Sequence, residues 1–504
     1  MGRMSRGLTR VPEAEATDQA KQIDHDRGPG TPREPTAGTT PGRWRAVAFG
    51  ALAGGLAVGA AAAGGGGARW LVLASIGVVV VNLVPIILAS RRPPIGPNPV
   101  APVPLDELPT VSVVIAGRDE AAVLPHLIAD LAAQDHRDAG GAPRFEVIVI
   151  DDRSSDGTPA AVDAAARSAG LGGVVRIVHR VGAGLPDGKG AALTAAQPET
   201  YQGDVVLVLD ADARIGPGFL RRLATYVACG VPAVSGRRRI LDAGSSQIAG
   251  AQADEQTQDG ELQRGRWASG GCSEFRGNGI AVRRDLLVAV GGWRASALTE
   301  DLDLSSRLAA EQGITVAWAL DLEIWEEPVR TWGGLWRQRL RWSEGSIRRL
   351  LEHGPAVLAS QRLTVKARLD FAAYAAQLLA PPLVLGAVAG AVATGAPGMA
   401  MALVGTYLAA GGVLAFDSLR WETDRNGAPL ALPERAYRAI RSALFGMIWL
   451  GAVPGALWRL ATRRGSIRYD KMPHHGLGMG PNSAAASGAG LSDGVGRAGG
   501  AGEP

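Results

Sequence analysis

Val205-Val206-Leu207-Val208-Leu209-Asp210-Ala211-Asp212 is the stretch that decides the fold. Its five consecutive apolar residues predict a strand that is buried on both faces. Two carboxylates follow at the carboxyl end of this strand, which is where open α/β sheets bind their ligands. Asp210 and Asp212 can offer hard oxygen ligands to Mg²⁺ or Mn²⁺ on a substrate phosphate. An acidic turn after a strand is the structural alternative, because Asp is common in turns.

Strands and helices alternate around this stretch. Short apolar runs predict strands at Val111–Ala116, Phe145–Ile150, Val174–His179 and Val205–Leu209, with helices such as Ala121–Ala133 and Pro159–Ser168 between them. Right-handed β-α-β units then give a mainly parallel sheet whose strands end on one edge. We therefore expect an α/β fold in which three polar groups meet at that edge: Arg118-Asp119-Glu120, Asp151-Asp152 and Asp210-Ala211-Asp212.

Two further motifs near this edge suit a nucleotide. Asp152 lies in Asp151–Thr158, where it can accept a hydrogen bond from a base, although the same Ser/Asp/Gly turn also suits simple helix capping. Lys189 is flanked by glycines in Asp187-Gly188-Lys189-Gly190 and can approach a phosphate closely. The spacing of a Walker loop is absent, and a solvated loop lysine is the ordinary alternative.

Two motifs farther along the chain contain residues that suit proton transfer and the binding of a diphosphate or a sugar. Thr299-Glu300-Asp301-Leu302-Asp303 opens a helix, and capping explains one or two of its acids but not all three. One of them can serve as a general base toward an acceptor hydroxyl. Gln338-Arg339-Leu340-Arg341-Trp342 lies on a basic, aromatic helix that begins near Trp332. This helix suits a membrane interface, or it offers a guanidinium to a diphosphate and an indole to a sugar ring.

Uncharged segments on both sides of this region predict membrane spans. Ala46–Gly67 and Trp70–Ala89 form a predicted hairpin, and the arginines that flank it place both of its ends in the cytoplasm. Later candidates are Phe371–Gly395, Gly398–Phe416 and the shorter Ser442–Trp458. Three later spans would leave the basic tail after Trp458 outside, against the positive-inside rule. Either Ser442–Trp458 is re-entrant or interfacial, or another predicted span is wrong.

The expected organisation has six parts, since 504 residues exceed one ordinary core. They are a disordered tail (1–42), a transmembrane hairpin (43–92), a Pro-rich linker (93–109), a cytoplasmic α/β domain (110–354), interfacial and transmembrane helices (355–470) and a second disordered tail (471–504). The net charge of +4 and the absence of a basic groove with interleaved aromatics argue against nucleic-acid binding. The two cysteines, Cys229 and Cys272, cannot form a disulfide framework.

Taken in order, these motifs resemble a membrane-bound family 2 glycosyltransferase with a GT-A fold. The likeness covers about Pro109 to Glu352, with membrane segments on both sides as in cellulose and hyaluronan synthases. The sequence departs from the pattern at Ala116-Gly117, where many members carry Pro. The resemblance implies roles for the following residues: Asp152, Arg118 and Glu120 at the uracil and ribose, Lys189 and Asp210 at the nucleotide, Asp210 and Asp212 as the DxD metal ligands with Asp212 foremost, Asp301 as the catalytic base, and Gln338, Arg341 and Trp342 beside the diphosphate and acceptor.

Within that family, four short stretches are similar to β-monoglucosyldiacylglycerol synthases, which move glucose from UDP-glucose to diacylglycerol. They are Glu274–Gly279, Thr299–Leu304, Glu326-Glu327 and Gln338–Gly345. The resemblance implies an inverting hexosyltransferase that uses a UDP-sugar, Mg²⁺ or Mn²⁺ and a membrane lipid acceptor. It also implies a multi-pass protein of the cell membrane with a cytoplasmic catalytic domain. A processive polysaccharide synthase and a non-catalytic membrane scaffold are the alternatives.

Overall fold

The computed structural model describes residues 41–64, 86–89, 91, 103–182, 184–196, 198–424, 427–462 and 476. The two predicted tails and the predicted span at Trp70–Ala89 lie almost entirely outside these residues, as do residues 93–102 of the predicted linker. All of the described residues belong to one compact unit that begins at Pro41. The fold can therefore be followed from the sheet to the helices that surround it.

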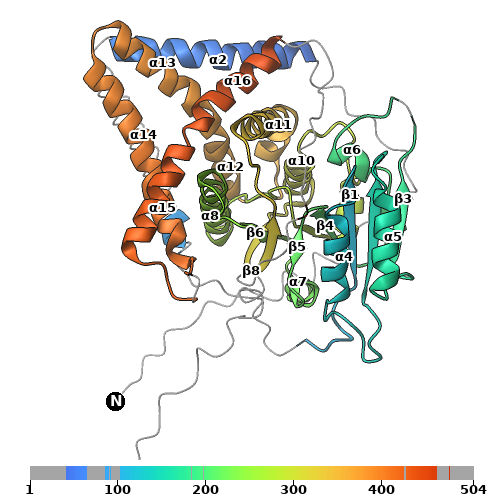
Figure 1. The fold of residues 1–504 in the computed structure, drawn as a ribbon. Helices are drawn as coiled ribbons and strands as arrows, with labels where there is room; N and C mark the ends of the chain where they lie inside the picture. Colours follow the sequence, from blue (N-terminus) through green and yellow to red (C-terminus); the bar gives the residue numbers. More distant parts are fainter. Residues whose placement is uncertain are drawn as a thin grey trace, which may run out of the picture. The chain divides into compact units, whose positions relative to one another are not determined.

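A mixed, mostly parallel sheet of eight strands forms the centre of the fold, in the order β3-β2-β1-β4-β7-β6-β8-β5 (Figure 1). The strands are β1 (Val111–Gly117), β2 (Phe145–Asp151), β3 (Val175–His179), β4 (Val205–Asp210), β5 (Arg214–Ile215), β6 (Ala233–Ile240), β7 (Ile280–Arg283) and β8 (Ala317–Glu326). The first four strands pair in parallel, which confirms the four strands expected from the sequence. The later strands add antiparallel pairs on both sides of β7 and between β5 and β8.

Helices cover both faces of the sheet, because the apolar side chains of β4 alternate between two cores. Val205, Leu207 and Leu209 join the core under α4 (Leu124–Ala132), α5 (Thr158–Ser168) and α7 (Phe219–Ala228). Val206 and Val208 join the opposite core with α6 (Lys189–Leu193), α9 (Arg284–Ala289) and α10 (Glu300–Arg307). The prediction of a strand buried on both faces is thus confirmed.

The parallel register brings the polar groups to one edge of the sheet. Gly117 pairs with Asp151 and Ala116 pairs with Asp210, so β1, β2 and β4 end at the same level. The residues that follow these strands must therefore face a common space beyond the carboxyl edge. This is the arrangement expected from the sequence.

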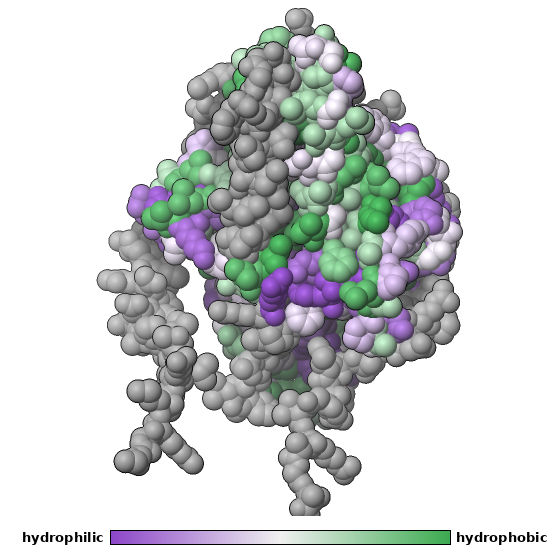
Figure 2. All heavy atoms as spheres, turned by 90° about the vertical axis from the view of Figure 1, so that its left-hand side faces the viewer, coloured by the Kyte–Doolittle hydropathy of each residue, from purple (hydrophilic) through white to green (hydrophobic). Residues whose placement is uncertain are grey.

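The remaining helices extend from this domain. They are α2 (Pro41–Gly64), α8 (Gln247–Ala268), the π-helical turn η2 (Leu308–Gln312), α11 (Trp332–Ala359), α12 (Val365–Ala376), α13 (Ala380–Ala393), α14 (Pro397–Ser418), α15 (Leu432–Phe445) and α16 (Ile448–Thr462), with short 3₁₀ turns η1 (Pro198–Thr200), η3 (Gln377–Leu379) and η4 (Leu419–Trp421). Within the described parts, four segments are long and apolar enough to cross a membrane: Trp44–Ala61, Val365–Ala393, Pro397–Trp421 and Leu432–Thr462. Figure 2, seen from the side of α13 and α14, shows apolar side chains gathered on this face next to polar ones. These features indicate membrane association.

Glycines allow α2 and α13 to pack in close contact. A Cβ on Gly59 would lie 2.3 Å from the Leu383 carbonyl oxygen, and one on Gly386 would lie 2.2 Å from that of Leu56. The same approach recurs one turn later, where Gly390 meets Ala60. Small residues spaced by four let helix backbones approach in this way inside membranes. Because the partners advance together along both helices, α2 and α13 run in the same direction.

We expect Gly59→Ala to destabilise the contact between α2 and α13 by about 1–3 kcal/mol, because the added methyl group overlaps backbone atoms. Gly54→Ala is the matched control, since nothing lies within 4 Å of its added Cβ. The measurement is the midpoint of heat-induced loss of monodisperse protein in detergent, followed by size-exclusion chromatography. Equal midpoints for the two variants would contradict the close packing.

Candidate active site

One cleft of about 1940 Å³ runs from the carboxyl edge of the sheet to the helices after α11. All ten residues to which the sequence assigned a role line this cleft: Arg118, Glu120, Asp152, Lys189, Asp210, Asp212, Asp301, Gln338, Arg341 and Trp342. They come from the end of β4, from loops after β1, β2 and β4 and from α6, α10 and α11. The fold therefore gathers residues that lie as far as 224 positions apart in the chain (Arg118 to Trp342).

Lys189 occupies the centre of the polar half of the cleft. Its ammonium group donates to Asp210 Oδ1 at 2.5 Å and to the Gly277 carbonyl oxygen at 3.2 Å, and Glu300 Oε1 lies 3.3 Å away. Burial lowers the pKa of Lys189, but the charges of Asp210 and Glu300 outweigh it and hold the pKa above the ordinary value. Lys189 is thus a fixed cation that joins the DxD segment to the start of α10.

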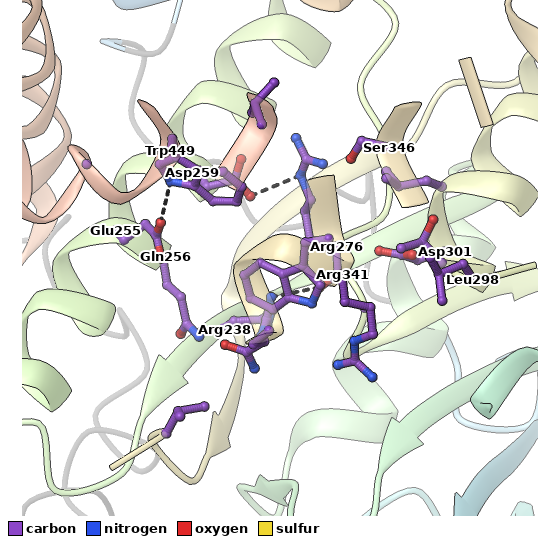
Figure 3. A pocket seen from close by; sticks show the side chains of 18 of the residues that line it. Arg238, Glu255, Gln256, Asp259, Arg276, Leu298, Asp301, Arg341, Ser346 and Trp449 are labelled. Atoms are coloured by element: carbon purple, nitrogen blue, oxygen red, sulfur yellow. Dashed lines mark hydrogen bonds and ion pairs between the residues drawn. The ribbon is translucent and has the colours of Figure 1, made fainter. Parts of the chain in front are cut away.

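The three acids in the first turn of α10 have different surroundings. Glu300 faces Lys189, and Asp303 is bound by Arg307 at 2.7 Å and by His353 at 2.8 Å. Within the described parts of the chain, no cation lies within 4.0 Å of the Asp301 carboxylate. Asp301 is 9% exposed, and it points into the cleft in Figure 3. Of the three, Asp301 is therefore the acid left to act on a bound molecule.

The surroundings of Asp301 also suit a base that works near neutral pH. Burial, followed by the negative charge of Glu300, raises the pKa of Asp301 to about 6. A Cβ on Gly277 would lie 4.0 Å from Asp301 Oδ2, so a larger side chain there would face this carboxylate. Gly277 has a positive φ of 80°, a conformation that other residues rarely adopt.

Asp210 and Asp212 offer a donor set that fits Mg²⁺ or Mn²⁺. Asp210 ends β4, and Asp212 Oδ2 accepts from the backbone N–H of Glu327 at 3.0 Å. The backbone N–H of Asp210 donates to Asn278 Oδ1 at 3.0 Å, which fixes the turn. Two carboxylates that line an open cleft match the preference of these ions for oxygen ligands, with room left for further ligands.

A second acidic group outside the cleft is better explained by ion pairing. Asp303, Glu352 and His353 offer ligand atoms within 4.8 Å of one another. Arg307 already contacts the Asp303 carboxylate, and Arg294 lies 3.1 Å from Glu352. These guanidinium groups supply the positive charge that a metal ion would otherwise provide. We therefore interpret this cluster as a support that joins α10 to α11.

The end of the cleft beside β1 and β2 is rich in ion pairs. Asp152 Oδ1 accepts from Arg153 and from Arg180, each at 2.8 Å, and only 7% of Asp152 is exposed. Glu120 is also buried, and its backbone N–H donates to Thr158 Oγ1 at 2.8 Å. Arg118 is more open, with 48% of its side chain exposed. Asp152 thus lies in the cleft, whereas the N-cap of α5, Gly157, makes no side-chain capping hydrogen bond.

Helix α11 forms the opposite wall and carries Gln338, Arg341 and Trp342. Two guanidinium groups lie over the indole of Trp342, those of Arg339 at 4.2 Å and of Arg238 at 5.6 Å from the ring centroid. In Figure 3, Arg341 lies between Arg238 and Asp301, and all three residues line the cleft. The structure thus places the Gln-Arg-Leu-Arg-Trp motif beside the acid of α10, as the sequence led us to expect.

Several residues of the cleft were not predicted to act there. Arg238 binds Glu326 across the sheet, and Arg276 binds Asp259 at 3.0 Å and the hydroxyl of Tyr374. The Arg237-Arg238-Arg239 run was a visible signal for the first of these. No local motif marks Asp259 or Tyr374, because their positions depend on how α8 and α12 pack.

The other half of the cleft is apolar. It continues between α13, α14, α15 and α16, where its lining includes Leu383, Val384, Leu403, Tyr407, Ala410, Gly411, Ala443 and Val453. Tyr374 lies at the junction, with its ring 3.9 Å from the guanidinium carbon of Arg266. A single cleft thus joins a charged site to an apolar chamber between candidate membrane helices.

Comparison with known proteins agrees with this geometry. Residues 109–345 match the family described as Glycosyltransferase like family 2. The chain is 33% identical over 308 residues to the β-monoglucosyldiacylglycerol synthase of Synechocystis sp., covering 60% of this chain and 61% of that protein. It is 29% identical over 377 residues to the enzyme of the same name from Trichormus variabilis, covering 74% and 78%. The chain thus spans about three fifths of the length of the Synechocystis relative.

A solved structure shares the fold. The mannosyltransferase PcManGT from Pyrobaculum calidifontis, in complex with GDP-Man and Mn²⁺, superposes with a TM-score of 0.52 at 22% identity, covering 77% of this chain and 96% of that one. This likeness supports the GT-A architecture expected from the sequence. The match to the glycosyltransferase family 2 model covers residues 109–345, just under half of the chain.

Proposed function

We propose that this protein is an inverting glycosyltransferase that moves a hexose, glucose in the first instance, from a UDP-sugar to a lipid acceptor such as diacylglycerol. The single observation that carries the proposal is the cleft that joins the DxD aspartates and Asp301 to the apolar chamber between α13, α14 and α16. A water-soluble acceptor would gain nothing from that chamber, whereas acyl chains would be stabilised by it. The two relatives named β-monoglucosyldiacylglycerol synthase support the choice of sugar and acceptor.

In the proposed reaction, Asp301 takes the proton of the acceptor hydroxyl as its oxygen attacks the anomeric carbon. The bond from that carbon to the β-phosphate oxygen breaks, and UDP leaves with the electron pair. Attack on the face opposite the leaving group gives a β-linked product. Arg341 and Lys189 supply fixed positive charge near the space where the diphosphate would lie, and such preorganised charge usually contributes most to catalysis.

Asp210 and Asp212 would hold a divalent metal ion on the diphosphate. When bound, the metal would stabilise the negative charge that grows on the leaving group. The membrane helices would dock this site at the inner face of the cell membrane, with the 110–354 domain in the cytoplasm. Tyr374 and α12 would connect that domain to the spans.

The direct test supplies membranes containing the protein with radiolabelled UDP-glucose and Mg²⁺, and then partitions the product between organic solvent and water. We expect label in the organic phase at the mobility of a monoglycosylated lipid. High-mass label in water would instead indicate a polysaccharide synthase and would overturn the proposal. No label in either phase, with UDP-glucose and with other UDP-hexoses, would favour the non-catalytic scaffold.

Asp212→Asn should lower transfer at least about 10²-fold, because the leaving-group charge loses its stabilisation. Binding of UDP, measured by calorimetry, should lose its dependence on Mg²⁺ in this variant. Asp163→Asn is the control, because Asp163 lies on the outer side of α5 with 54% of its side chain exposed. Metal-dependent UDP binding in Asp212→Asn would contradict the assignment.

Asp301→Asn should lower turnover by about 10²–10⁴-fold while UDP binding stays intact, because only the proton acceptor is lost. The pKa of about 6 also predicts a pH profile. A carboxyl with a raised pKa remains protonated up to that pH, so kcat/KM should fall about tenfold per unit as the pH drops below about 6. A wild-type profile that stays flat down to pH 5 would contradict the role of Asp301.

Ala410→Trp should block the apolar chamber and select against long acyl chains. Ala410 lines the cleft, whereas the neighbouring Ala409 is exposed on the outside of α14, so Ala409→Trp is the matched control. Transfer to dioleoylglycerol should fall more than transfer to dioctanoylglycerol in Ala410→Trp and not in the control. An equal loss for both acceptors would place the acyl chains elsewhere.

A further inference from the structure

Helices α15 and α16 together make up one candidate membrane span, Leu432–Thr462. That segment is 31 residues long, but it is divided near Gly446 into helices of 14 and 15 residues. At 1.5 Å per residue, each helix is about 21–22 Å long. Neither alone matches the roughly 30 Å thickness of the hydrocarbon core, but α13 has only 14 residues as well, so length does not decide whether a helix crosses. Their contacts therefore decide whether the pair crosses the membrane.

Helix α15 is fixed to the catalytic domain by buried charge. Arg438 and Arg441 each lie 2.7 Å from Asp254 of α8, whose side chain is fully buried. Ser442 adds a hydrogen bond to Gln258, also on α8. The other side of α15 exposes Ile440 and Leu444, at 61% and 58%. One face thus binds a soluble domain while the opposite face presents apolar side chains, which is typical of a helix that lies in the membrane interface.

Helix α16 follows α11 of the catalytic domain through successive turns. Added Cβ atoms on Gly451 and Gly455 would lie 2.9 Å from Trp336 and 3.1 Å from Leu340, and Arg459 lies 3.5 Å from Glu344. At the start of α16, Trp449 donates to Glu255 of α8 at 2.8 Å. Both ends of α16 are therefore held against the domain.

Helix α11 cannot cross a bilayer, because its sequence from Arg337 to His353 carries many charged residues. The turns of α16 that touch it must lie at a similar depth. In Figure 1, α13 and α14 extend away from the catalytic domain, whereas α16 lies over α11.

The contacts of α16 with α2 also favour an α16 that does not span the membrane. Among the described side chains, the hydrophobic cluster that joins them includes Ala48, Ala51 and Leu52 of α2, which lie in the N-terminal half of that helix. By contrast, α13 follows α2 from Gly55 to Ala60. A helix that spans the membrane beside α2 would continue along it as α13 does. The cluster residues that α16 shares with α2 lie nearer the N-terminus of α2 than the glycine contacts of α13 do.

Both ends of the α13–α14 hairpin are attached to the catalytic domain. Before α13, Tyr374 binds Arg276, and after α14, Glu422 binds Arg237 and Arg239 of β6. The hairpin thus leaves the domain and returns to it. Helix α15 begins on the side of the membrane where that domain lies.

We propose that α15 and α16 form an in-plane collar at the lipid headgroup level, so that the end of α16 stays on the same side of the bilayer as the catalytic domain. The collar packs against α8 and α11 and presents Ile440 and Leu444 to the acyl boundary of the membrane. Its residues Gly446, Trp449 and Val453 line the cleft, so the collar also forms a wall of the cleft at this level. Because the collar does not cross the membrane, the basic residues after Trp458 stay on the side of the catalytic domain. This arrangement agrees with the positive-inside rule, which a third span would violate.

Labelling with a membrane-impermeant maleimide on sealed vesicles of known orientation tests the collar. The native Cys229 is exposed on the catalytic domain and serves as the reference, while Cys272 is buried. In a Cys229→Ser background, Thr462→Cys reports the end of α16, which is exposed. Gly398→Cys reports the far end of the hairpin, where nothing lies within 4 Å of an added Cβ.

We expect Thr462→Cys to react from the same side as Cys229 and Gly398→Cys to react only from the opposite side. Reaction of Thr462→Cys from the Gly398→Cys side would overturn the collar. Reaction of all three from one side would also overturn it, because the hairpin would then not cross the bilayer.

Depth gives a second readout that does not depend on sidedness. Residue 444 lies near the middle of Leu432–Thr462, so a true span would place it near the bilayer centre. A fluorophore on Leu444→Cys should instead be quenched more strongly by phosphatidylcholine with a spin label near the headgroup than by lipid labelled deep in the chain. The reverse order of quenching would show that this segment crosses the membrane.

Discussion

The buried ammonium group of Lys189 is the interaction on which the catalytic site depends. It contacts Asp210 at the end of β4, Glu300 at the start of α10 and the carbonyl oxygen of Gly277. These segments come from different parts of the chain, and the acids among them would repel one another without a cation between them. Removing one partner of a buried ion pair typically costs about 3–5 kcal/mol. Lys189 therefore holds the DxD turn and the predicted base in one arrangement. It also leaves Asp301, the neighbour of Glu300, as the acid of this turn that faces the cleft without a paired cation among the described residues.

The polar site and the membrane helices are connected by a second set of buried cations. Arg266 of α8 binds Asp370 at 2.9 Å and stacks on Tyr374, and Arg276 binds both Asp259 and Tyr374. These contacts fix α12, which leads directly into α13. The wall of the apolar chamber is thus attached to the same domain that carries Asp301. In the proposed reaction, this connection sets how far the acceptor hydroxyl can reach from the membrane, because a hydroxyl must come within hydrogen-bond distance of its base.

Periodicity and turn chemistry predicted the parts of the fold whose signals are local. The four parallel strands follow from short apolar runs, and their common edge follows from the handedness of β-α-β units. The later strands of the sheet were not predicted in this way. Strand β6, for example, contains three consecutive arginines and does not have the pattern of a buried strand. Those arginines are tolerated since Glu323, Glu326 and Glu422 pair with them from other elements. For the site, motif order identified residues that do share one cleft, whereas Asp259 and Tyr374 depend on tertiary packing. Composition also predicted one segment, Ser442–Trp458, that includes the end of α15 and most of α16, because composition does not register where one helix ends and the next begins.

Depth is the constraint that links the collar to the chemistry. The hydroxyl of diacylglycerol lies at the headgroup level, while its acyl chains occupy the hydrocarbon core. An enzyme that acts on such a group must either lift the lipid out of the bilayer, at about 0.8 kcal/mol for each CH₂ group exposed to water, or bring its base down to that level. A collar that packs on α11 lowers Asp301 and Trp342 toward the interface without burying their charged neighbours in the membrane core. In the proposed reaction, the apolar half of the cleft would keep the chains covered while the hydroxyl reaches the polar half. A spanning α16 would leave α11 without this apolar partner, exposing Trp336 and Leu340 where a polar domain meets the membrane surface.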